Sequence, residues 1–444
     1  MGEEGKKGNP DKMGALKFWG WQMRAVSAGC VVIVLGYLSL YCTTVLMLPA
    51  SLVGTLMLVS KVFDGVTDVF AGYLIDKTKT RWGKARPYEF CILALWLCTW
   101  LLFTCSAEWS TTVKAVWVFI MYTFVNSIFA TFLNTNQTAY MVRAFPTQNQ
   151  IVKLNSYGGI VVTIGSAVVS ISFPILMGTM ATSAAGWSKL MGIYALPLAL
   201  IGMLRFLFVK ETVNVDDNGA EVNIKGMLEV LKTNKYIYLI AGIGLLYNLT
   251  LGLNAGSYYF TYVVGDIGKY SLIAMLSMPM LIVMFVFPIA LKKVTIAKLI
   301  MIGAVIGVAG GLLNFFAGSN MVLLMIAGAC IAFAGLPLAY LSGLMILDCA
   351  SFNETRGLPR MEGTLSAFTS FATKIGQGVG AALLGGILSM GGFDGAQTVQ
   401  GDSTLLAIRL LYGIIPMIIF VLIAFMANAY KLDAKLKKLN SDSK

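Results

Sequence analysis

Histidine is absent from this chain of 444 residues, and charged residues make up only 12% of it. Without histidine, the chain lacks both the commonest metal ligand and the commonest proton shuttle. Soluble proteins carry roughly 25% charged residues. Half that share, together with 57% hydrophobic residues and a mean hydropathy of +0.78, indicates that lipid is the main solvent of this chain.

The seven cysteines show no chemical pattern either. All lie in apolar stretches, without metal-ligand spacing or basic neighbours, so we interpret them as free, buried thiols. An intramembrane enzyme needs a nucleophile–base pair or a set of metal ligands, and the sequence offers neither. We therefore expect no enzymatic activity. A cleavable signal peptide is not expected, because residues 1–14 are polar and charged.

About twelve apolar stretches are long enough to cross a bilayer, which takes about 20 residues. The expected spans are 20–46, 52–75, 88–106, 113–141, 155–180, 187–209, 236–264, 269–291, 297–317, 321–350, 362–388 and 405–430. A long polar stretch separates the first six from the last six. We therefore expect an all-α membrane protein with two six-helix halves of the major facilitator type. The predicted parts are an N-terminal bundle at 1–209, a cytoplasmic middle loop at 210–235, a C-terminal bundle at 236–430 and a cytoplasmic tail at 431–444.

Lysine and arginine concentrate in alternate loops and in both tails, and most densely in the loop at 77–86. The positive-inside rule then places these loops, the middle loop and both termini in the cytoplasm. The rule also accounts for the net charge of +12 without a nucleic-acid partner. We expect a multi-pass monomer in the bacterial inner membrane, whose partners are lipid and a small-molecule substrate.

The second expected span holds three charged residues at membrane depth, Lys61, Asp64 and Asp68. Such residues cost about 2.5–3.5 kcal/mol each on insertion scales, so they are functional candidates. Their spacing puts them on one helical face, with Thr67 beside it. Two carboxylates one turn apart must share a proton, hold a cation or pair with a positive group. Because oxygen ligands suit a hard ion, we predict that Asp64 and Asp68 bind a coupling cation. The alternative is a Lys61–Asp64 ion pair that stabilises the bundle.

The fourth expected span carries a polar run at 134–138 that also includes Gln137. Within it, Asn134 and Thr138 follow Thr131 at i+3 and i+7 and form a polar stripe. Aligned amides and hydroxyls suit a hydroxyl-rich ligand, and the alternative is hydrogen bonding between helices.

Two basic residues lie in other spans. Lys374, near the middle of the eleventh span, must pair with an acid or lose its proton. Three interpretations are open: Lys374 pairs with the acids of the second span, it binds an anionic part of the substrate, or its side chain snorkels to the membrane interface. Arg24, at the start of the first span, is a weaker candidate that also suits the cytoplasmic edge.

Three segments, in the right order and spacing, resemble the glycoside–pentoside–hexuronide:cation symporters, the group of the melibiose and glucuronide carriers. They are KVFDGVTDVFAGYLIDKTKTRWGKARPY at 61–88, YYFTYVVGD at 258–266, and the stretch from Asp348 through RMEG at 360–363 to Lys374. The similarity runs nearly end to end. It implies a major facilitator fold and alternating access. It also implies uptake of a sugar, glycoside or hexuronide, coupled to Na⁺, Li⁺ or H⁺ and without any other cofactor.

The resemblance also implies roles for individual residues. Asp64, Asp68 and Thr131 would be cation ligands, holding Na⁺ if sodium is the coupling ion, with Thr67 as a further polar ligand. The residues implied for substrate binding or for linking the two sites are Arg24, Asn134, Thr138 and Lys374. We add Gln137 to the substrate set because it belongs to the same polar run, and Lys61 as a second charge partner.

The substrate half departs from that family's pattern. Residues 135–137 replace a usual Ile-Pro-Tyr or Ile-Pro-Phe, so a helix-kinking proline is absent, and Thr138 replaces an aromatic. Gly158 stands where that family usually has an arginine. Ala25 stands where the family has an acid directly after the basic residue of the first span. A standard galactoside is therefore not the expected cargo. The alternatives are a cation-coupled carrier of a non-sugar, anionic small organic molecule, and a sensor that binds without flux.

Overall fold

A computed structural model of the chain describes residues 13–78, 80–212, 224–276 and 293–432, with a few positions between 279 and 291. The secondary structure of the described residues is helical apart from turns, loops and one isolated β-bridge between Thr80 and Gly83. Within the same ranges, nine helices are long and apolar enough to cross a membrane. The chain is therefore an all-α membrane protein, as predicted.

The first six expected spans coincide with helices that are continuous or only briefly interrupted. They are α1 (Ala15–Leu35) with α2 (Leu38–Thr44), α3 (Ala50–Lys77), η1 (Arg86–Phe90) with α4 (Cys91–Leu102), α5 (Thr111–Thr123) with η2 (Phe124–Ala130) and α6 (Thr131–Ala144), α7 (Gln148–Met180) and α8 (Ala184–Phe208). In the middle of the fourth span, η2 is a π-helical segment, where the sequence pattern predicts a continuous α-helix.

The later spans follow the same pattern. They are α10 (Tyr236–Leu253) with α11 (Gly256–Tyr258) and η3 (Tyr259–Val263), η4 (Ile267–Lys269) with α12 (Tyr270–Met275), α14 (Ile296–Ala317), α15 (Met321–Thr355), α16 (Glu362–Met390), and α17 (Asp402–Arg409) with η5 (Leu410–Ile414) and α18 (Ile415–Ala429). The predicted span 269–291 is described at 269–276 and then only at some positions between 279 and 291. The middle loop, predicted as a polar loop, contains the helix α9 (Ile224–Thr233).

The chain divides into two compact units. Unit 1 comprises Met1–Leu38, Phe63–Ser106 and Val116–Gly219, and unit 2 comprises Ser39–Val62, Ala107–Ala115 and Ala220–Lys444. The main division falls inside the predicted middle loop. Two short segments, 39–62 and 107–115, group with the later helices although they precede that loop.

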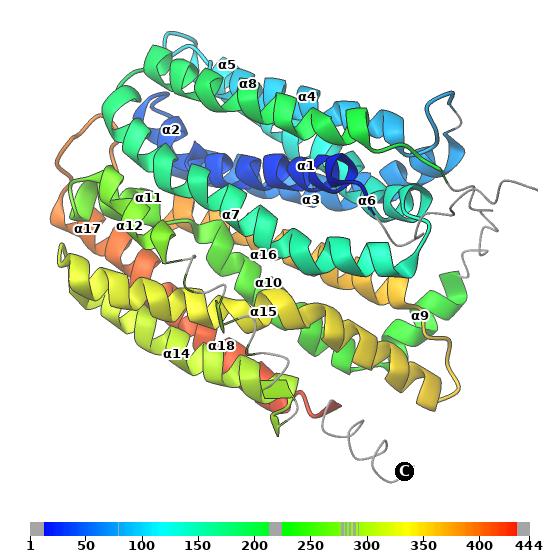
Figure 1. Ribbon diagram of the computed structural model, residues 1–444. Coiled ribbons are helices and arrows are strands. Elements are labelled where there is room, and N and C mark those ends of the chain that lie inside the picture. Colours follow the sequence, from blue (N-terminus) through cyan, green and yellow to red (C-terminus); the bar gives the residue numbers. More distant parts are fainter. Residues whose placement is uncertain are drawn as a thin grey trace, which may run out of the picture. The chain divides into compact units, whose positions relative to one another are not determined.

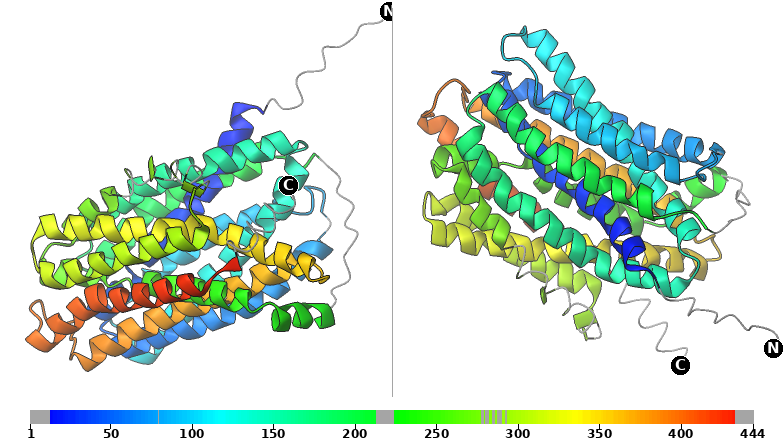
Figure 2. Two further views of the ribbon diagram at one scale, coloured as in Figure 1. Left: turned by 90° about the horizontal axis from the view of Figure 1, so that it is seen from below. Right: turned by 45° about the horizontal axis from the view of Figure 1, so that its top comes forward.

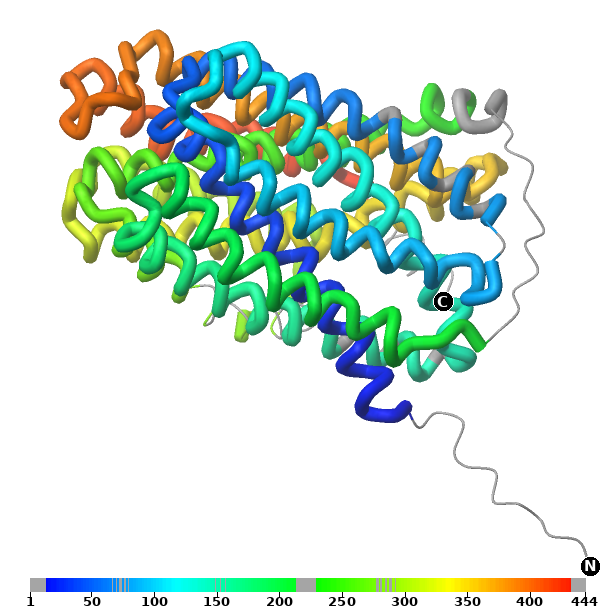
Figure 3. Tube along the Cα trace, turned by 90° about the horizontal axis from the view of Figure 1, so that it is seen from above, coloured from blue at the N-terminus to red at the C-terminus, as the bar shows by residue number. Residues whose placement is uncertain are grey.

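Unit 1 is built around α1, which packs against α7 and α8, while α8 also packs against α4 (Figures 1 and 3). Small residues allow this close approach, as they do in other membrane bundles. A Cβ at Gly202 of α8 would lie 2.7 Å from Ser27 Oγ, and one at Gly20 of α1 would lie 3.1 Å from the carbonyl oxygen of Leu204. Larger residues at either position would push the helices apart.

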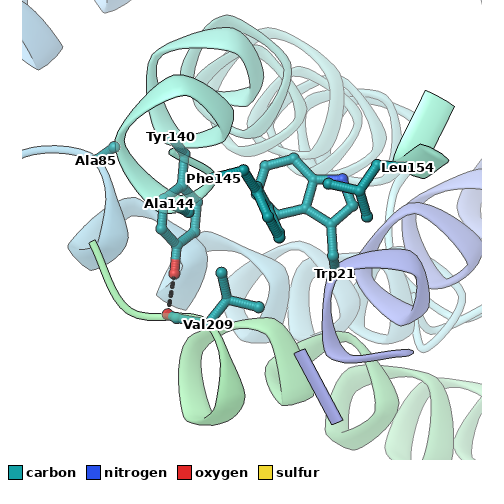
Figure 4. Packing of buried hydrophobic residues seen from close by; sticks show 7 residues of the cluster. All are labelled: Trp21, Ala85, Tyr140, Ala144, Phe145, Leu154 and Val209. Atoms are coloured by element: carbon teal, nitrogen blue, oxygen red, sulfur yellow. Dashed lines mark hydrogen bonds between the residues drawn. The ribbon is translucent and has the colours of Figure 1, made fainter. Parts of the chain in front are cut away.

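An aromatic cluster ties the end of α6 to the start of α1 and to the residue after α8 (Figure 4). The rings of Trp21 and Phe145 meet edge-on, with centroids 5.1 Å apart. The Tyr140 hydroxyl donates to the Val209 carbonyl at 2.6 Å. Because Tyr140 is fully buried, its hydroxyl needs this acceptor. The cluster fixes α6, which carries the predicted polar stripe, against α1.

In unit 2, α14 and α15 run side by side, and α10 packs against α16 (Figures 1 and 2). The first part of α3 also belongs to this unit and lies against α16 at several glycines. A Cβ at Gly54 would lie 2.6 Å from the Ala381 carbonyl oxygen, and one at Gly385 would lie 2.2 Å from that of Ala50. Residue numbers fall on α16 as they rise on α3, so the two helices are antiparallel there.

Candidate functional site

The predicted acid Asp64 lies in the part of α3 that belongs to unit 1, and it is only 4% exposed. The hydroxyl of Thr131, itself 3% exposed, donates to Asp64 Oδ1 at 2.9 Å. Thr67 donates to the backbone carbonyl of Asp64 at 3.0 Å. Asp68 follows one turn later and is half-buried. We call these four residues the oxygen site, because every side-chain polar atom they offer is an oxygen.

The π-helical segment η2 positions Thr131. A π segment widens the helix by one residue in its turn, and such segments are frequent at functional sites. Here Thr131 follows η2 directly, and its hydroxyl lies 3.3 Å from the carbonyl of Asn126, five residues earlier. The Asn126 amide donates to the Tyr122 carbonyl at 3.1 Å. Tyr122 is buried and lies within electrostatic reach of Asp64.

A second polar centre in unit 1 involves two residues that the sequence interpretation missed, Glu89 and Arg205. Arg24 Nε lies 3.5 Å from Glu89 Oε2, and Arg205 Nη1 lies 3.6 Å from Glu89 Oε1. The exposed fractions of the side chains of Arg24, Glu89 and Arg205 are 4%, 0% and 0%. Glu89 is therefore a buried carboxylate between two buried guanidinium groups.

Gln137 joins this centre through its side-chain oxygen. Gln137 Oε1 accepts a hydrogen bond from Arg24 Nη2 and another, at 2.6 Å, from Arg205 Nη1. The other donors of Arg205 are held by the carbonyl of Trp21, at 3.1 and 2.7 Å, and its guanidinium lies over the indole ring. We call Arg24, Glu89, Gln137 and Arg205 the arginine centre. It brings together two predicted substrate residues, Arg24 and Gln137.

The remaining predicted residues of the fourth span, Asn134 and Thr138, are exposed on α6, while Gln137 between them is half-buried. Positions three and four apart on a helix are neighbours, so Asn134 flanks both Gln137 and Thr138. The polar stripe thus starts inside the unit at Thr131 and continues to an accessible surface of α6.

Glu89 and Arg205 could have been found by the rule that singled out Asp64. Both are ionisable residues within expected spans, at 88–106 and 187–209. Each lies near the end of its span, where charged residues are common because the membrane edge is close. For this reason neither was predicted as a functional residue. The sequence does not show that the turn at η1 brings Glu89 to Arg24 of α1 and Arg205 of α8.

Glu211 anchors that turn. Its carboxylate accepts hydrogen bonds from the backbone N–H groups of Lys84 at 3.1 Å, Ala85 at 2.8 Å and Arg86 at 2.7 Å. Backbone N–H groups at the start of a helix favour an anion in this way. Gly83 has φ +114°, and a Cβ there would lie 2.4 Å from Glu211 Oε1. The glycine therefore permits both the backbone conformation and the approach of the carboxylate.

The two predicted basic residues of the charge network, Lys61 and Lys374, both belong to unit 2. Lys61 is buried on α3, and Lys374 is half-buried on α16. A Cβ at Gly378 would lie 3.0 Å from Lys61 Cβ. Lys374 precedes Gly378 by four residues, about one turn of α16.

Unit 2 also contains a cavity of about 220 Å³ between α10, α14, α15 and α16. Its polar lining residues are Tyr247, Asn248, Ser342 and Thr373, and the last of these adjoins Lys374. The rest of the lining is apolar or glycine. Over the described ranges, no group of three or more His, Cys, Asp or Glu residues gathers as a transition-metal site would require.

Comparison with known proteins agrees with this architecture. A profile of MFS/sugar transport proteins matches residues 26–434. An isoprimeverose transporter from Lactiplantibacillus pentosus is 29% identical over 423 residues, covering 91% of this chain and 86% of that protein. A glucuronide carrier protein homolog from Escherichia coli (strain K12) is 27% identical over 424 residues, covering 91% and 89%.

Solved structures show the same fold at much lower identity. A bacterial homolog of the human lysosomal transporter Spinster, in an inward-facing and unoccupied conformation, superposes with a TM-score of 0.70 at 13% identity, covering 96% of this chain and 99% of that one. A nucleoside transporter gives 0.67 at 15% identity, covering 94% and 99%. At these identities the likeness concerns the fold alone.

Proposed function

Because the chain belongs to the family of MFS/sugar transport proteins, we propose that it is a cation-coupled symporter of a sugar, glycoside or hexuronide in the bacterial inner membrane. It works by alternating access, with both termini in the cytoplasm. The observation that carries the proposal is the buried hydrogen bond between Thr131 and Asp64. Burying a carboxylate in a membrane bundle costs free energy, so such a residue is a candidate for a functional role.

The oxygen site takes the coupling cation. Asp64 and Asp68 supply the negative charge, and the hydroxyls of Thr131 and Thr67 supply neutral oxygens. The Thr131 hydroxyl donates a hydrogen bond to Asp64 and keeps lone pairs that a cation can use. Oxygen ligands suit Na⁺ and Li⁺, and the carboxylates alone suffice for H⁺.

Helix α6 links the cation to the cargo. Thr131 at its start belongs to the oxygen site, and Asn134, Gln137 and Thr138 follow within two turns. Cation binding at Thr131 therefore acts on the helix that carries the substrate residues, and Arg24 of α1 contacts Gln137 of that helix. Coupling between the two sites is reciprocal, so cargo must raise cation affinity by the same factor as cation raises cargo affinity.

A second candidate cargo, a non-sugar anionic molecule, is favoured by the arginine centre, where two guanidinium groups face one carboxylate. A substrate screen on proteoliposomes separates the two candidates, since a carrier of non-sugar acids would accumulate such acids and would not accumulate glycosides or hexuronides.

The direct test of the symport proposal is uptake by proteoliposomes over a panel of glycosides and uronides, with and without a Na⁺ gradient, at two pH values. We expect wild-type uptake to rise either with the Na⁺ gradient or at the lower pH, which supplies H⁺. Asp64→Asn and Asp68→Cys should lose that stimulation while the protein remains inserted. The matched control is Glu108→Gln, which neutralises an exposed carboxylate. Cation-driven accumulation that persists in both aspartate variants would overturn the cation site.

A further inference from the structure

The orientation of the Gln137 amide is set by its neighbours. Arginine has five N–H donors and no acceptor. The atom of Gln137 that meets both Arg24 and Arg205 must therefore be the oxygen, and the amide nitrogen Nε2 must point the other way. Neither arginine can turn to accept a hydrogen bond from Nε2. The arrangement leaves the Gln137 amide one orientation.

The nitrogen of Gln137 is available for a ligand. Both hydrogen bonds of this side chain in the described structure go to Oε1, and Nε2 is not among the buried polar atoms without a partner. Gln137 is half-buried between the exposed residues Asn134 and Thr138. Its two N–H donors are thus presented at the accessible part of the polar stripe, backed by a rigid, buried support.

The charge behind this amide is positive. Arg24 and Arg205 are both buried, and Glu89 is the one carboxylate within ion-pair distance of either in the described part of the chain. The two contacts, at 3.5 and 3.6 Å, are also too long for good hydrogen bonds. A buried charge without compensation is costly. A ligand that brings one negative charge to the front of the amide would relieve this excess.

We propose that Gln137 Nε2 binds an anionic group of the cargo, and that Arg24 and Arg205 are positioning residues that orient this amide and supply a favourable field. The cargo is then a sugar acid, with a carboxylate or sulfonate, and not a neutral sugar. This inference rests on the proposed transport function and names its substrate class. It also gives Arg24 a role without direct contact to the cargo.

The proposal is tested with matched pairs of sugars that differ only in the acid group, such as methyl β-glucuronide and methyl β-glucoside, and galacturonate and galactose. Binding to the purified full-length protein is read as the ligand-induced rise in Tm, and transport as competition in proteoliposomes. We expect each acid to raise Tm more than its neutral partner. An equal or larger effect of the neutral sugars, or no effect of either acid, would overturn the proposal.

The variants separate an orienting role from a merely structural one. Gln137→Glu removes the N–H donors and neutralises the two arginines, so the apparent affinity for the acid should fall about 10- to 100-fold, as for a lost hydrogen bond to a charged group. The affinity for the neutral partner should change much less. Arg24→Gln should lower the ratio of acid to neutral affinity in the same direction. Gln397→Glu makes the same chemical change at an exposed amide and serves as the control.

The outcomes also separate this inference from the symport proposal. If the acid is preferred but no cation gradient drives its uptake, the symport proposal fails and the specificity stands. If uptake is cation-driven but Gln137→Glu weakens acid and neutral sugars equally, the role of Gln137 fails and symport stands.

Discussion

The two polar centres of unit 1 differ in sign and in how they are held. In the oxygen site, Asp64 and Asp68 are one turn apart, and Thr131 and Thr67 add hydroxyl groups beside Asp64. In the arginine centre, two guanidinium groups face a single carboxylate, Glu89. We therefore expect one centre to attract a cation and the other an anion, although α6 contributes to both. We propose on this ground that the coupling ion and the charged part of the cargo bind at separate places joined by one helix.

The largest expected effect concerns stability and falls on the arginine centre. Glu89→Gln leaves two buried arginines without a counter-charge, which typically costs about 3–5 kcal/mol. Chemical denaturation of the purified protein should show this loss in the free energy of unfolding. The control is Glu354→Gln, which breaks a mostly exposed pair with Arg360 and should cost less than about 1 kcal/mol. Equal losses in the two variants would show that the arginine centre is not a coupled charge cluster.

A smaller effect is expected at Gly83, which supports the arginine centre from a distance. Gly83→Ala forces a side chain into a left-handed conformation and against the Glu211 carboxylate. Strain of this kind costs of order 1–3 kcal/mol. Tm should fall, and the preference for acid over neutral sugar should weaken because Glu89 follows this turn. The cation dependence of uptake should not change. A variant that alters only the cation dependence would contradict the separation of the two centres.

The next effect concerns the oxygen site alone. Thr131→Ala removes a neutral oxygen ligand and leaves both carboxylates in place. We expect the cation concentration for half-maximal uptake to rise about tenfold, which corresponds to about 1.4 kcal/mol at 25 °C. Thr131→Ser keeps the hydroxyl and should restore most of the affinity. If Ala and Ser at this position behave alike, the hydroxyl of Thr131 is not a ligand.

The smallest effect is expected at Thr67, whose hydroxyl donates to the backbone carbonyl of Asp64. Thr67→Val keeps the shape of the side chain and removes its oxygen. Cation affinity should fall by less than about tenfold, because the side chain is half-buried and the carboxylates remain. A loss larger than that of Thr131→Ala, measured in the same uptake assay, would reverse the ranking of the two hydroxyls.

Much of the fold could be predicted from the sequence, because lipid demands long apolar helices and the apolar runs show where they lie. The helical nature and the candidate acids Asp64 and Asp68 follow from composition and spacing, and the family follows from the resemblance of three sequence segments. The π segment η2 could not be predicted, since its residues do not differ from those of an ordinary helix. The helix α9 was missed because its mixed composition resembles a loop.

The arginine centre shows why a site is harder to predict than a fold. The sequence predicts Arg24 and Gln137 as site residues, but the contacts that Arg24 and Arg205 both make with Gln137 depend on the packing of α1, α6 and α8. Glu89 depends on the turn that Glu211 and Gly83 stabilise, which is a contact between residues more than a hundred positions apart. Local sequence patterns do not predict such long-range contacts. They do predict the pair Asp64 and Asp68, because its members are four residues apart on one helix.

The most direct test of the account is a measurement of reciprocal coupling between the two centres. The Kd of the preferred cargo is measured with and without the coupling cation, and the Kd of the cation with and without cargo, in wild type and in Asp64→Asn. The account predicts that the two ratios are equal in wild type, and that the cargo Kd no longer depends on the cation in Asp64→Asn. A cargo Kd that still responds to the cation in Asp64→Asn would contradict it.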